Sequence, residues 1–402
     1  MKKYLLRGLV LSVLAIVAII GCSDSTSIAP ETEENITEPS PIQGQYIVVL
    51  KGSGKNKLVP GQISQIETVR NEIIDRNRIS SELIKNKFNH ALPAFVAELS
   101  DEQLEKLKKD KNVSYIEQDR IVSFAPPCGT PNGGPCDGDG GGGSDSQETP
   151  YGITRVNGGV SYTGSGVAWI IDTGIDLDHP DLNVDASRGF NAFTKGKDGK
   201  SLDDGNGHGS HVAGTVAAID NTEGVIGVAA GATVIPVKVL DSRGSGSYSG
   251  VIAGVDHVGA NGSSGDVANM SLGGPVSQAL DDAVKNAAQS SGVKFVLAAG
   301  NESDDANNHS PARANGNNIY TISAMNSNDS WASFSNYGNP PVDYAAPGVS
   351  IRSTWKNGSY NTISGTSMAA PHAAGILLLG NASTDGNVLG DPDGNADPII
   401  VH

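Results

Sequence analysis

Three polar stretches after residue 150 carry the residue types that nucleophilic catalysis needs. They are DTGIDLDHPDL, which begins with Asp172, GHGSHVAGTV, which holds His208 and His211, and SGTSMAAPH, which holds Ser367. A serine hydroxyl becomes a good nucleophile only when a neighbouring base takes its proton and a third group orients that base. The stretches supply a hydroxyl, an imidazole and a carboxylate. Their residue types alone do not choose between the two histidines, and each stretch taken singly also fits a turn or a helix end.

Small side chains surround Ser367 in SGTSMAAPH. Gly and Ala let a backbone or a ligand approach closely, and Pro371 is of a type tolerated in the first turn of a helix, so we expect a helix to begin beside Ser367. The small residues would leave one hydroxyl accessible. A tight joint between a loop and a helix would explain them equally well.

The segments that would position these residues alternate between short apolar strands and glycine-punctuated helices. The strands are expected at 166–172, 234–240, 267–272 and 294–301, and the helices at 209–219, 249–260 and 278–291. Continuous apolar strands alternating with helices predict a parallel sheet with helices on both faces. Function in such sheets gathers at the carboxyl ends of strands, where Asp172 and Asn301 both lie.

An earlier segment, residues 45–123, has a different pattern. Strands are expected at 46–50, near 88–91, at 94–99 and at 113–118, with helices at 63–84 and 101–110, the second opened by a capping box of Ser100 and Gln103. This βαββαβ order predicts a small α+β domain of the ferredoxin-like kind. It holds no cluster of catalytic residue types.

The 402 residues are 38% apolar and 18% charged, which is typical of globular domains and allows two or more cores. The net charge of −16 is uneven. Residues 123–402 hold 12 basic and 28 acidic side chains, a net −16, whereas residues 45–122 hold 13 and 11, a net +2. The acidic body argues against nucleic-acid binding and could attract cations.

The N-terminus has the pattern of an export signal. Lys2, Lys3 and Arg7 precede the apolar run 8–20, which ends at Gly21 and Cys22. We expect a signal peptide over residues 1–21 and a disordered, Ser/Thr/Glu/Pro-rich spacer over 22–44. A membrane anchor is the alternative, for which the run is short.

Two further cysteines, Cys128 and Cys136, lie in the Gly/Pro-rich segment 124–145, which we interpret as a linker. In an exported chain a short-loop disulfide between them is favoured over a metal site. Two unpaired, exposed thiols are the alternative.

Taken in order, the motifs DTGID, HPDL, HGSHVAGT, NMSLGG, AAGNE and GTSMAAPH resemble those of the subtilisin-like serine peptidases. The resemblance implies a parallel, seven-stranded-type sheet and a serine endopeptidase with Ser367 as nucleophile, His208 as general base and acid, and Asp172 as the carboxylate that orients the base. It selects His208 rather than His211. It also implies that Asn301 and the Ser367 N–H stabilise the oxyanion.

One departure from the family pattern is Ser210, where the family usually has Thr. The triad does not depend on this change.

The resemblance further implies two edge segments, 244–250 and 271–274, that pair with an extended substrate. The implied substrate-binding residues are Gly246, Ser247, Ser271, Leu272, Gly273, Ala298, Ala299 and Gly300. Their small side chains favour broad specificity, with an apolar preference at the P1 position.

A structural calcium site is implied as well. Its ligands would be Gln147, Asp181, Ile219, Asn221, Glu223 and Val225. Oxygen ligands of this number suit Ca²⁺. A solvated acidic loop is the alternative, and no organic cofactor is expected.

The segment 45–123 resembles the inhibitory prosegment of the same family, and IIGC resembles the signal of bacterial lipoproteins, in which Cys22 would carry lipid. We therefore expect a self-processed, monomeric peptidase domain at 146–382, cut near Ser146 and followed by a polar tail at 383–402. If Cys22 is acylated, the cut releases the enzyme from the membrane.

Rival interpretations rest on single motifs. WIIDTGI resembles the catalytic turn of aspartic peptidases, but that class needs two such turns and the sequence has one. A metallohydrolase built on His208 and His211 lacks the HExxH motif, and GKDGKS lacks the first glycine of a nucleotide-binding loop. An anchored binding protein would not need the intact set of catalytic residue types.

Overall fold

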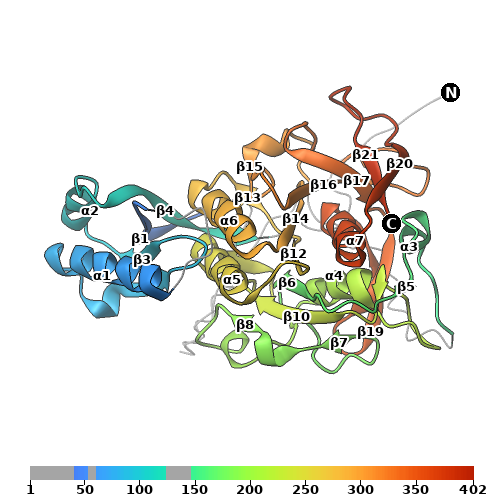
Figure 1. Cartoon of the computed structure of the whole chain (residues 1–402), viewed down its shortest axis with the longest axis horizontal. Coiled ribbons are helices and arrows are strands. Elements are labelled where there is room, and N and C mark those ends of the chain that lie inside the picture. The colour runs from blue at the N-terminus through green and yellow to red at the C-terminus, as the bar shows by residue number, and fades with distance from the viewer. Residues whose placement is uncertain (1–39, 53–59, 124–145) are drawn as a thin grey trace, which may run out of the picture. The chain divides into compact units, whose positions relative to one another are not determined.

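The computed structural model describes residues 40–52, 60–123 and 146–402 (Figure 1). The described residues between 40 and 123 form an α+β unit, called the first segment below, and residues 146–402 form the second segment. The elements of the first segment are β1 (Pro41–Leu50), α1 (Pro60–Arg76), β2 (Ile84–Phe88), β3 (Ala94–Glu98), α2 (Asp101–Leu107) and β4 (Val113–Ser123). The strands pair antiparallel in the order β4-β1-β3-β2. This order confirms the predicted ferredoxin-like arrangement.

Local signals in this unit are largely as expected. Ser100 and Gln103 form the predicted capping box at the start of α2. The helix α1 ends at Arg76, earlier than predicted, because Arg78 adopts a positive φ and the chain turns toward β2. The strand β2 ends at Phe88, so residues 89–91 form a turn instead of a strand.

The second segment is built on a mostly parallel sheet with the order β20-β21-β17-β16-β14-β12-β6-β10-β7. Its longer strands are β6 (Ala168–Asp172), β10 (Thr233–Lys238), β12 (Val267–Met270), β14 (Lys294–Ala298), β16 (Ile319–Met325) and β17 (Val342–Pro347). Short strands are β5 (Val160–Ser161), β7 (Asn183–Val184), β8 (Phe190–Asn191), β9 (Ala229–Ala230), β11 (Ser245–Ser247), β13 (Gly274–Pro275) and β15 (His309–Ser310). The helices are α3 (Tyr151–Arg155), α4 (His208–Ala217), α5 (Tyr248–Asn261), α6 (Gln278–Ser291) and α7 (Thr366–Leu379).

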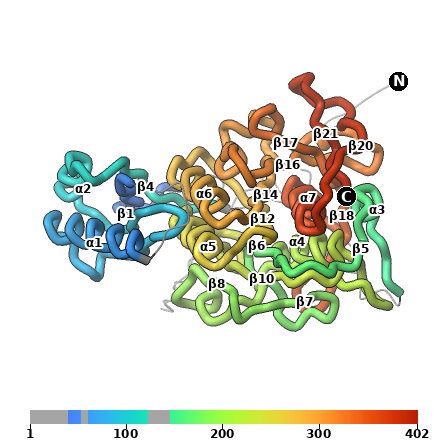
Figure 2. The backbone as a smooth tube through the Cα atoms, viewed as in Figure 1, coloured from blue at the N-terminus to red at the C-terminus, as the bar shows by residue number. Residues whose placement is uncertain are grey.

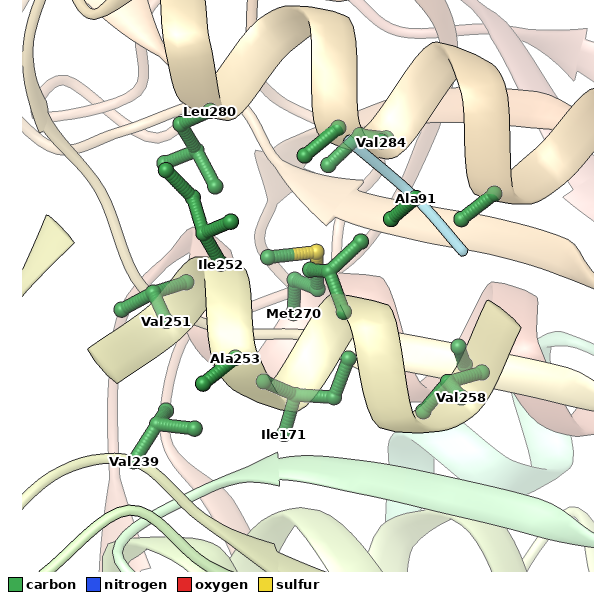
Figure 3. Packing of buried hydrophobic residues seen from close by; sticks show 14 of the residues in the cluster. Ala91, Ile171, Val239, Val251, Ile252, Ala253, Val258, Met270, Leu280 and Val284 are labelled. Atoms are coloured by element: carbon green, nitrogen blue, oxygen red, sulfur yellow. The ribbon is translucent and has the colours of Figure 1, made fainter. Parts of the chain in front are cut away.

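Alternate residues of β6 show how the helices cover both faces of this sheet. Trp169 and Ile171 pack in the core that includes α5 and α6, whereas Ala168 and Ile170 pack in the core that includes α4 and α7. Side chains of successive strand residues point to opposite faces, so a wholly apolar strand must be buried on both. Figure 3 shows Ile171 and Met270 among side chains of α5 and α6, with Ala91 of the first segment in the same cluster.

Several elements were not predicted, among them the strands β16 and β17 of the sheet. The strands β18 (Ile351–Trp355) and β19 (Ser359–Ile363) form a hairpin that packs against α4. Residues 383–402, expected to be a polar tail, form β20 (Ser383–Asn387) and β21 (Pro398–Val401), and β21 pairs parallel with β17. The expectation of a tail was wrong because Ile399, Ile400 and Val401 are buried, although the residues around them are polar.

The residues after β21 are also tied to the sheet region. The N–H of His402 donates to the carbonyl of Val156, directly after α3, at 3.0 Å. Figure 2 shows the C-terminus beside α3. Among the described helices, none combines the length and apolarity that crossing a membrane would require.

Candidate active site

The strand β6 ends in a buried carboxylate. Asp172 is fully buried, and its Oδ1 accepts the backbone N–H of Thr173 and the Nδ1–H of His208, each at 2.8 Å. Within the described part of the chain, its Oδ2 has no hydrogen-bond partner. A buried carboxylate that accepts the Nδ1–H of a histidine fixes that ring in the tautomer whose Nε2 can take a proton.

His208 is the first residue of α4. The preceding Gly207 has φ 114°, a left-handed conformation that favours glycine, and a Cβ built there would lie 2.3 Å from the Trp355 ring. Both constraints explain why a glycine precedes the histidine. The chain therefore enters α4 along one path, and His208 starts the helix beside the end of β6.

The second histidine of the motif has a different environment. His211 is fully buried, and its Nε2–H donates to the carbonyl of Ile351 at 2.9 Å. Burial lowers its pKa to about 3, so the ring is neutral at ordinary pH. The geometry thus pairs His208 with Asp172 and ties His211 to β18, a distinction that the residue types did not make.

Ser367 is the second residue of α7. Its hydroxyl donates to the carbonyl of Ser271 at 3.3 Å, and its own carbonyl accepts the Ser271 hydroxyl at 2.7 Å. The helix begins beside Ser367 as predicted, but Pro371 lies in the second turn rather than the first. Because Pro371 has no N–H, the Ser367 carbonyl lacks its usual helical partner and is available to Ser271.

The strand order brings these residues to one edge. Asp172 ends β6, Ser271 directly follows β12, and Asn301 follows β14; these three strands are adjacent and parallel. Neighbouring strands lie about 4.8 Å apart, so groups at their carboxyl ends are close together. Ser367 joins this edge through its two hydrogen bonds with Ser271.

Asn301 is oriented by the first residue of α7. Its Oδ1 accepts the backbone N–H and the hydroxyl of Thr366 at 2.8 and 2.9 Å. Its Nδ2 therefore carries the donors of this amide. Ser367 N–H belongs to the first turn of α7, where N–H groups have no intrahelical acceptor.

A small pocket, partly open to solvent, adjoins Ser367. Its lining includes Leu272, Gly273, Ala298, Ala299, Gly300, Asn301 and Ser367 from the predicted site, and Gly274, Glu302, His309, Ala312 and Thr366 besides. Glu302 and His309 were not predicted to bind substrate. The only sequence signal for Glu302 was that it is the charged residue of the motif AAGNE. No sequence signal pointed to His309, which is the first residue of β15.

The other segment predicted to bind substrate, residues 244–250, is already paired with a strand of the first segment. The strand β11 pairs antiparallel with the end of β4, with Gly246 opposite Val122 and Ser247 opposite Ile121. The first segment thus places an extended strand against the edge at which a substrate was expected to lie.

Carboxylates hold the first segment to the two helices beside this edge. Glu117 accepts the N–H of Ala279 at 3.0 Å near the start of α6, and Asp119 accepts the N–H of Ser249 at 3.1 Å near the start of α5. Burial raises the pKa of Glu117. Negative side chains are favourable at helix N-termini. These contacts were not predictable from local sequence patterns, because they join residues more than a hundred positions apart.

Asp256 of α5 adds a third anchor. Its carboxylate accepts the backbone N–H groups of His90 at 2.6 Å and Ala91 at 2.7 Å, and that of Asn89 at 3.2 Å. Three N–H donors from one turn converge on one carboxylate, so the turn between β2 and β3 is fixed to α5.

The predicted calcium ligands lie in one region. Asp181 accepts the Asn221 Nδ2–H at 2.8 Å and the Val225 N–H at 3.0 Å. The side-chain amide of Gln147 lies beside the Asn221 carbonyl and the Asp220 carboxylate. No group of three or more His, Cys, Asp or Glu side chains in the described residues is arranged to hold a metal. Ile219 and Glu223 would contribute backbone carbonyls.

Three predicted sites, Cys22, Cys128 and Cys136, lie outside the described residues.

Comparison with known proteins gives two family matches. Residues 165–384 match the Subtilase family, and residues 45–125 match Peptidase inhibitor I9. The chain is 41% identical to "Alkaline serine exoprotease A" of Vibrio alginolyticus, over 84% of this chain and 60% of that protein. It is 38% identical to "Extracellular serine proteinase" of Thermus sp. (strain Rt41A), over 93% of this chain and 89% of that protein.

A solved structure described as a cold adapted subtilisin-like serine proteinase resembles the chain with a TM-score of 0.53 and 37% identity. It covers 64% of this chain and 98% of its own.

Proposed function

This chain belongs to the subtilase family, and from that premise we propose that it is a serine endopeptidase made as a precursor and inhibited by its own N-terminal segment. The observation that carries the proposal is the buried 2.8 Å contact between Asp172 and His208, at the same sheet edge as Ser367. The family match alone would not assign these roles.

In the proposed reaction, the Ser367 Oγ attacks the carbonyl carbon of the scissile peptide bond and gives its proton to the His208 Nε2. Asp172 accepts the Nδ1–H and stabilises the imidazolium that forms. The oxyanion receives hydrogen bonds from the Asn301 Nδ2 and the Ser367 N–H. His208 then protonates the leaving amine, and water hydrolyses the acyl-enzyme by the same path in reverse.

The substrate would lie as an extended strand along β11, where β4 lies in the precursor. Backbone pairing along glycine and serine residues reads few side chains, which supports broad specificity. We propose that P1 enters the pocket beside Ser367, with an apolar preference set by Leu272, Ala298 and Ala299. Glu302 in its wall would disfavour acidic P1 side chains.

The Ser367→Ala variant of the full chain tests this function. The wild type should cleave a denatured protein substrate and convert to a shorter form, whereas Ser367→Ala should accumulate at the precursor mass. Ser383→Ala, an exposed serine on β20, is the matched control and should process normally. Inhibition by pepstatin but not by a serine-directed phosphonate would instead favour an aspartic peptidase.

We propose a structural Ca²⁺ site held by Gln147, Asp181, Asn221 and the carbonyls of Ile219, Glu223 and Val225. The chemistry of the donor set supports it, because two amide oxygens, one carboxylate and three carbonyls are hard oxygen ligands, and hydrogen bonds keep Asn221 and Val225 beside Asp181. When bound, the ion would stabilise this loop and take no part in the reaction.

Ser367→Ala protein should melt several degrees lower with a chelator, and an unchanged melting temperature would exclude the site.

Processing and location form a linked proposal. Residues 1–21 would direct export, 22–44 would be a spacer, 45–123 the prosegment, 124–145 a linker and 146–382 the peptidase domain, with lipid on Cys22 and a disulfide between Cys128 and Cys136. The N–H groups of Gln147 and Glu148 bind the carbonyls of Thr222 and Gly224, which supports a mature chain beginning near Ser146.

Cleavage near Ser146 would separate the enzyme from its lipid. Fully processed enzyme that still requires detergent for extraction would refute that release.

A further inference from the structure

A second buried carboxylate lies beside the catalytic pair. Asp204 is 3% exposed and belongs to the loop before α4. It accepts five hydrogen bonds, from Thr173 Oγ1 at 2.9 Å, Asn206 N at 2.9 Å, Gly207 N at 2.8 Å, Ser210 N at 2.9 Å and Ser210 Oγ at 2.8 Å. The donors come from the end of β6, from the loop and from α4. Asp204 therefore joins the three pieces of backbone that meet at His208.

These bonds supply the cap that α4 lacks. The N-cap residue, Gly207, has no side chain to bind the first N–H groups of the helix. The N–H of Gly209 instead donates to the Thr173 hydroxyl at 2.9 Å, which in turn donates to Asp204, and the N–H of Ser210 donates to Asp204 directly. The helix that begins with His208 is thus capped from outside.

The external cap is attached to the orienting carboxylate through the backbone. Thr173 directly follows Asp172, and its N–H donates to the Asp172 Oδ1. The hydroxyl of Thr173 holds Gly209, which directly follows His208. One buried carboxylate consequently fixes the residue next to each member of the Asp172–His208 pair.

We propose that Asp204 is a positioning residue, which together with Thr173 holds the start of α4 against the end of β6 so that the His208 Nδ1 stays 2.8 Å from the Asp172 Oδ1. This inference rests on the proposed function. A displacement of about 1 Å at a reacting group can reduce a rate about a hundredfold, so the effect should appear in kcat.

Two substitutions separate positioning from general stability. Asp204→Asn keeps the shape but turns an NH₂ group toward the N–H and hydroxyl donors. Asp266→Asn is the matched control, because Asp266 is 5% exposed and accepts the N–H groups of Val167 and Ser263 and the Trp169 Nε1–H, but at the opposite end of β6. Both variants should lower the free energy of unfolding, but only Asp204→Asn changes a residue beside the proposed catalytic pair.

The kinetic experiment uses full-length chains, processed by added wild-type enzyme if they do not process themselves. Asp204→Asn should lower kcat about 10- to 100-fold, with KM changed less than about threefold, and should shift the acid limb of the kcat/KM profile. Asp266→Asn should keep kcat within about twofold of the wild type. Equal kcat losses in the two variants would overturn the inference.

A spectroscopic measurement does not depend on activity. In the Ser367→Ala full chain, the proton between His208 and Asp172 should give a low-field ¹H resonance that Asp204→Asn shifts or broadens and Asp266→Asn leaves in place. An unchanged resonance in folded Asp204→Asn would contradict positioning even if the chain proved not to be a peptidase. If the wild-type protein shows no peptidase activity, that result would count against the proposed function but not against the positioning role of Asp204.

If Asp204→Asn does not fold, Thr173 provides the test. Thr173→Ser keeps the hydroxyl and should retain kcat within about twofold, whereas Thr173→Val removes it and should lower kcat about tenfold or more. Equal kcat values for the two Thr173 variants would overturn the inference.

Discussion

At Pro371 the absence of one N–H shapes the site. The carbonyl of Ser367, four residues earlier, is released from the helix ladder and accepts the Ser271 hydroxyl at 2.7 Å. Ser367 is thereby joined to the end of β12, and Thr366, its neighbour, orients Asn301 after β14. Two adjacent strands and one helix start therefore set the relative placement of the proposed nucleophile and the proposed oxyanion donor.

The Asn301→Leu variant tests the oxyanion role. Leucine has a similar size but no donor, so kcat should fall about 10²- to 10³-fold while KM changes little. Thr366→Val is the control, because it removes the hydroxyl that orients the Asn301 Oδ1 but leaves the Nδ2 donor, and its effect should be clearly smaller. Wild-type kcat in folded Asn301→Leu would exclude Asn301 from the oxyanion site.

Residue types and motifs pointed to Asp172, His208, Ser367 and Asn301, because each lies in a short segment with a recognisable pattern. They did not show which hydrogen-bond partner each histidine has. His208 and His211 differ by one helical turn, and only the fold shows that one meets Asp172 and the other Ile351. Asp204 gave no signal, because its role depends on donors from three separate segments.

The helices α4 and α7 pack together against the sheet, α4 also contacts β18 of the hairpin, and each helix contains a fully buried histidine. Burial lowers the pKa of His211 to about 3 and that of His372 to about 4, from an ordinary value of 6.5. Both rings stay neutral in the folded protein. When the chain unfolds in mild acid, both take up a proton, so acid favours the unfolded state.

His211 and His372 should therefore each lower the free energy of unfolding as the pH drops below about 6.5, by about 1.4 kcal/mol per pH unit, until about pH 4 for His372 and about pH 3 for His211. Asp281 and Asp391, whose pKa values burial raises to about 6, act in the opposite direction below about pH 6, so the contribution of one histidine is measured by comparing variants. Urea titrations of Ser367→Ala protein between pH 4.5 and 8, with and without His372→Gln, measure the slope of the unfolding free energy against pH. His372→Gln should reduce this slope by about 1.4 kcal/mol per pH unit. An equal slope in that variant would show that His372 is protonated in the folded state.

The elements that could be predicted were those whose hydrophobic pattern continues along their whole length. The strands β6 and β12 are mostly apolar and buried throughout, α6 is amphipathic, and all three were placed from sequence. The hairpin β18–β19 was missed although Asn357 and Gly358, both with positive φ, form the kind of Asn-Gly turn that marks a hairpin. The strand β21 was missed because its four residues stand in a polar context.

On the scale of the whole molecule, an acidic peptidase unit is held by a slightly basic N-terminal segment. Residues 45–122 carry a net +2 and residues 123–402 a net −16. Backbone pairing of β4 with β11 occupies the expected substrate edge, and Glu117, Asp119 and Asp256 fix the two units to each other. This arrangement explains how a folded active site can be present in the precursor and yet be closed to substrate.

Asp256→Asn in the full chain tests this clamp. The amide cannot accept three backbone N–H groups as well as the carboxylate does, so the cleaved prosegment should bind about tenfold more weakly and the lag before activity appears should shorten. Asp185→Asn, whose side chain binds Ser187 and Arg188 within its own loop, is the control. An unchanged lag would mean that Asp256 does not limit release of the prosegment.

The central claim is that Asp172, His208 and Ser367 act as one unit. A serine-directed phosphonate, followed by peptide mapping of the full chain by mass spectrometry, tests it most directly. We expect one label per chain, on Ser367, and a labelling rate reduced at least a thousandfold in His208→Ala. Labelling at another residue, or an equal rate in wild type and His208→Ala, would contradict it.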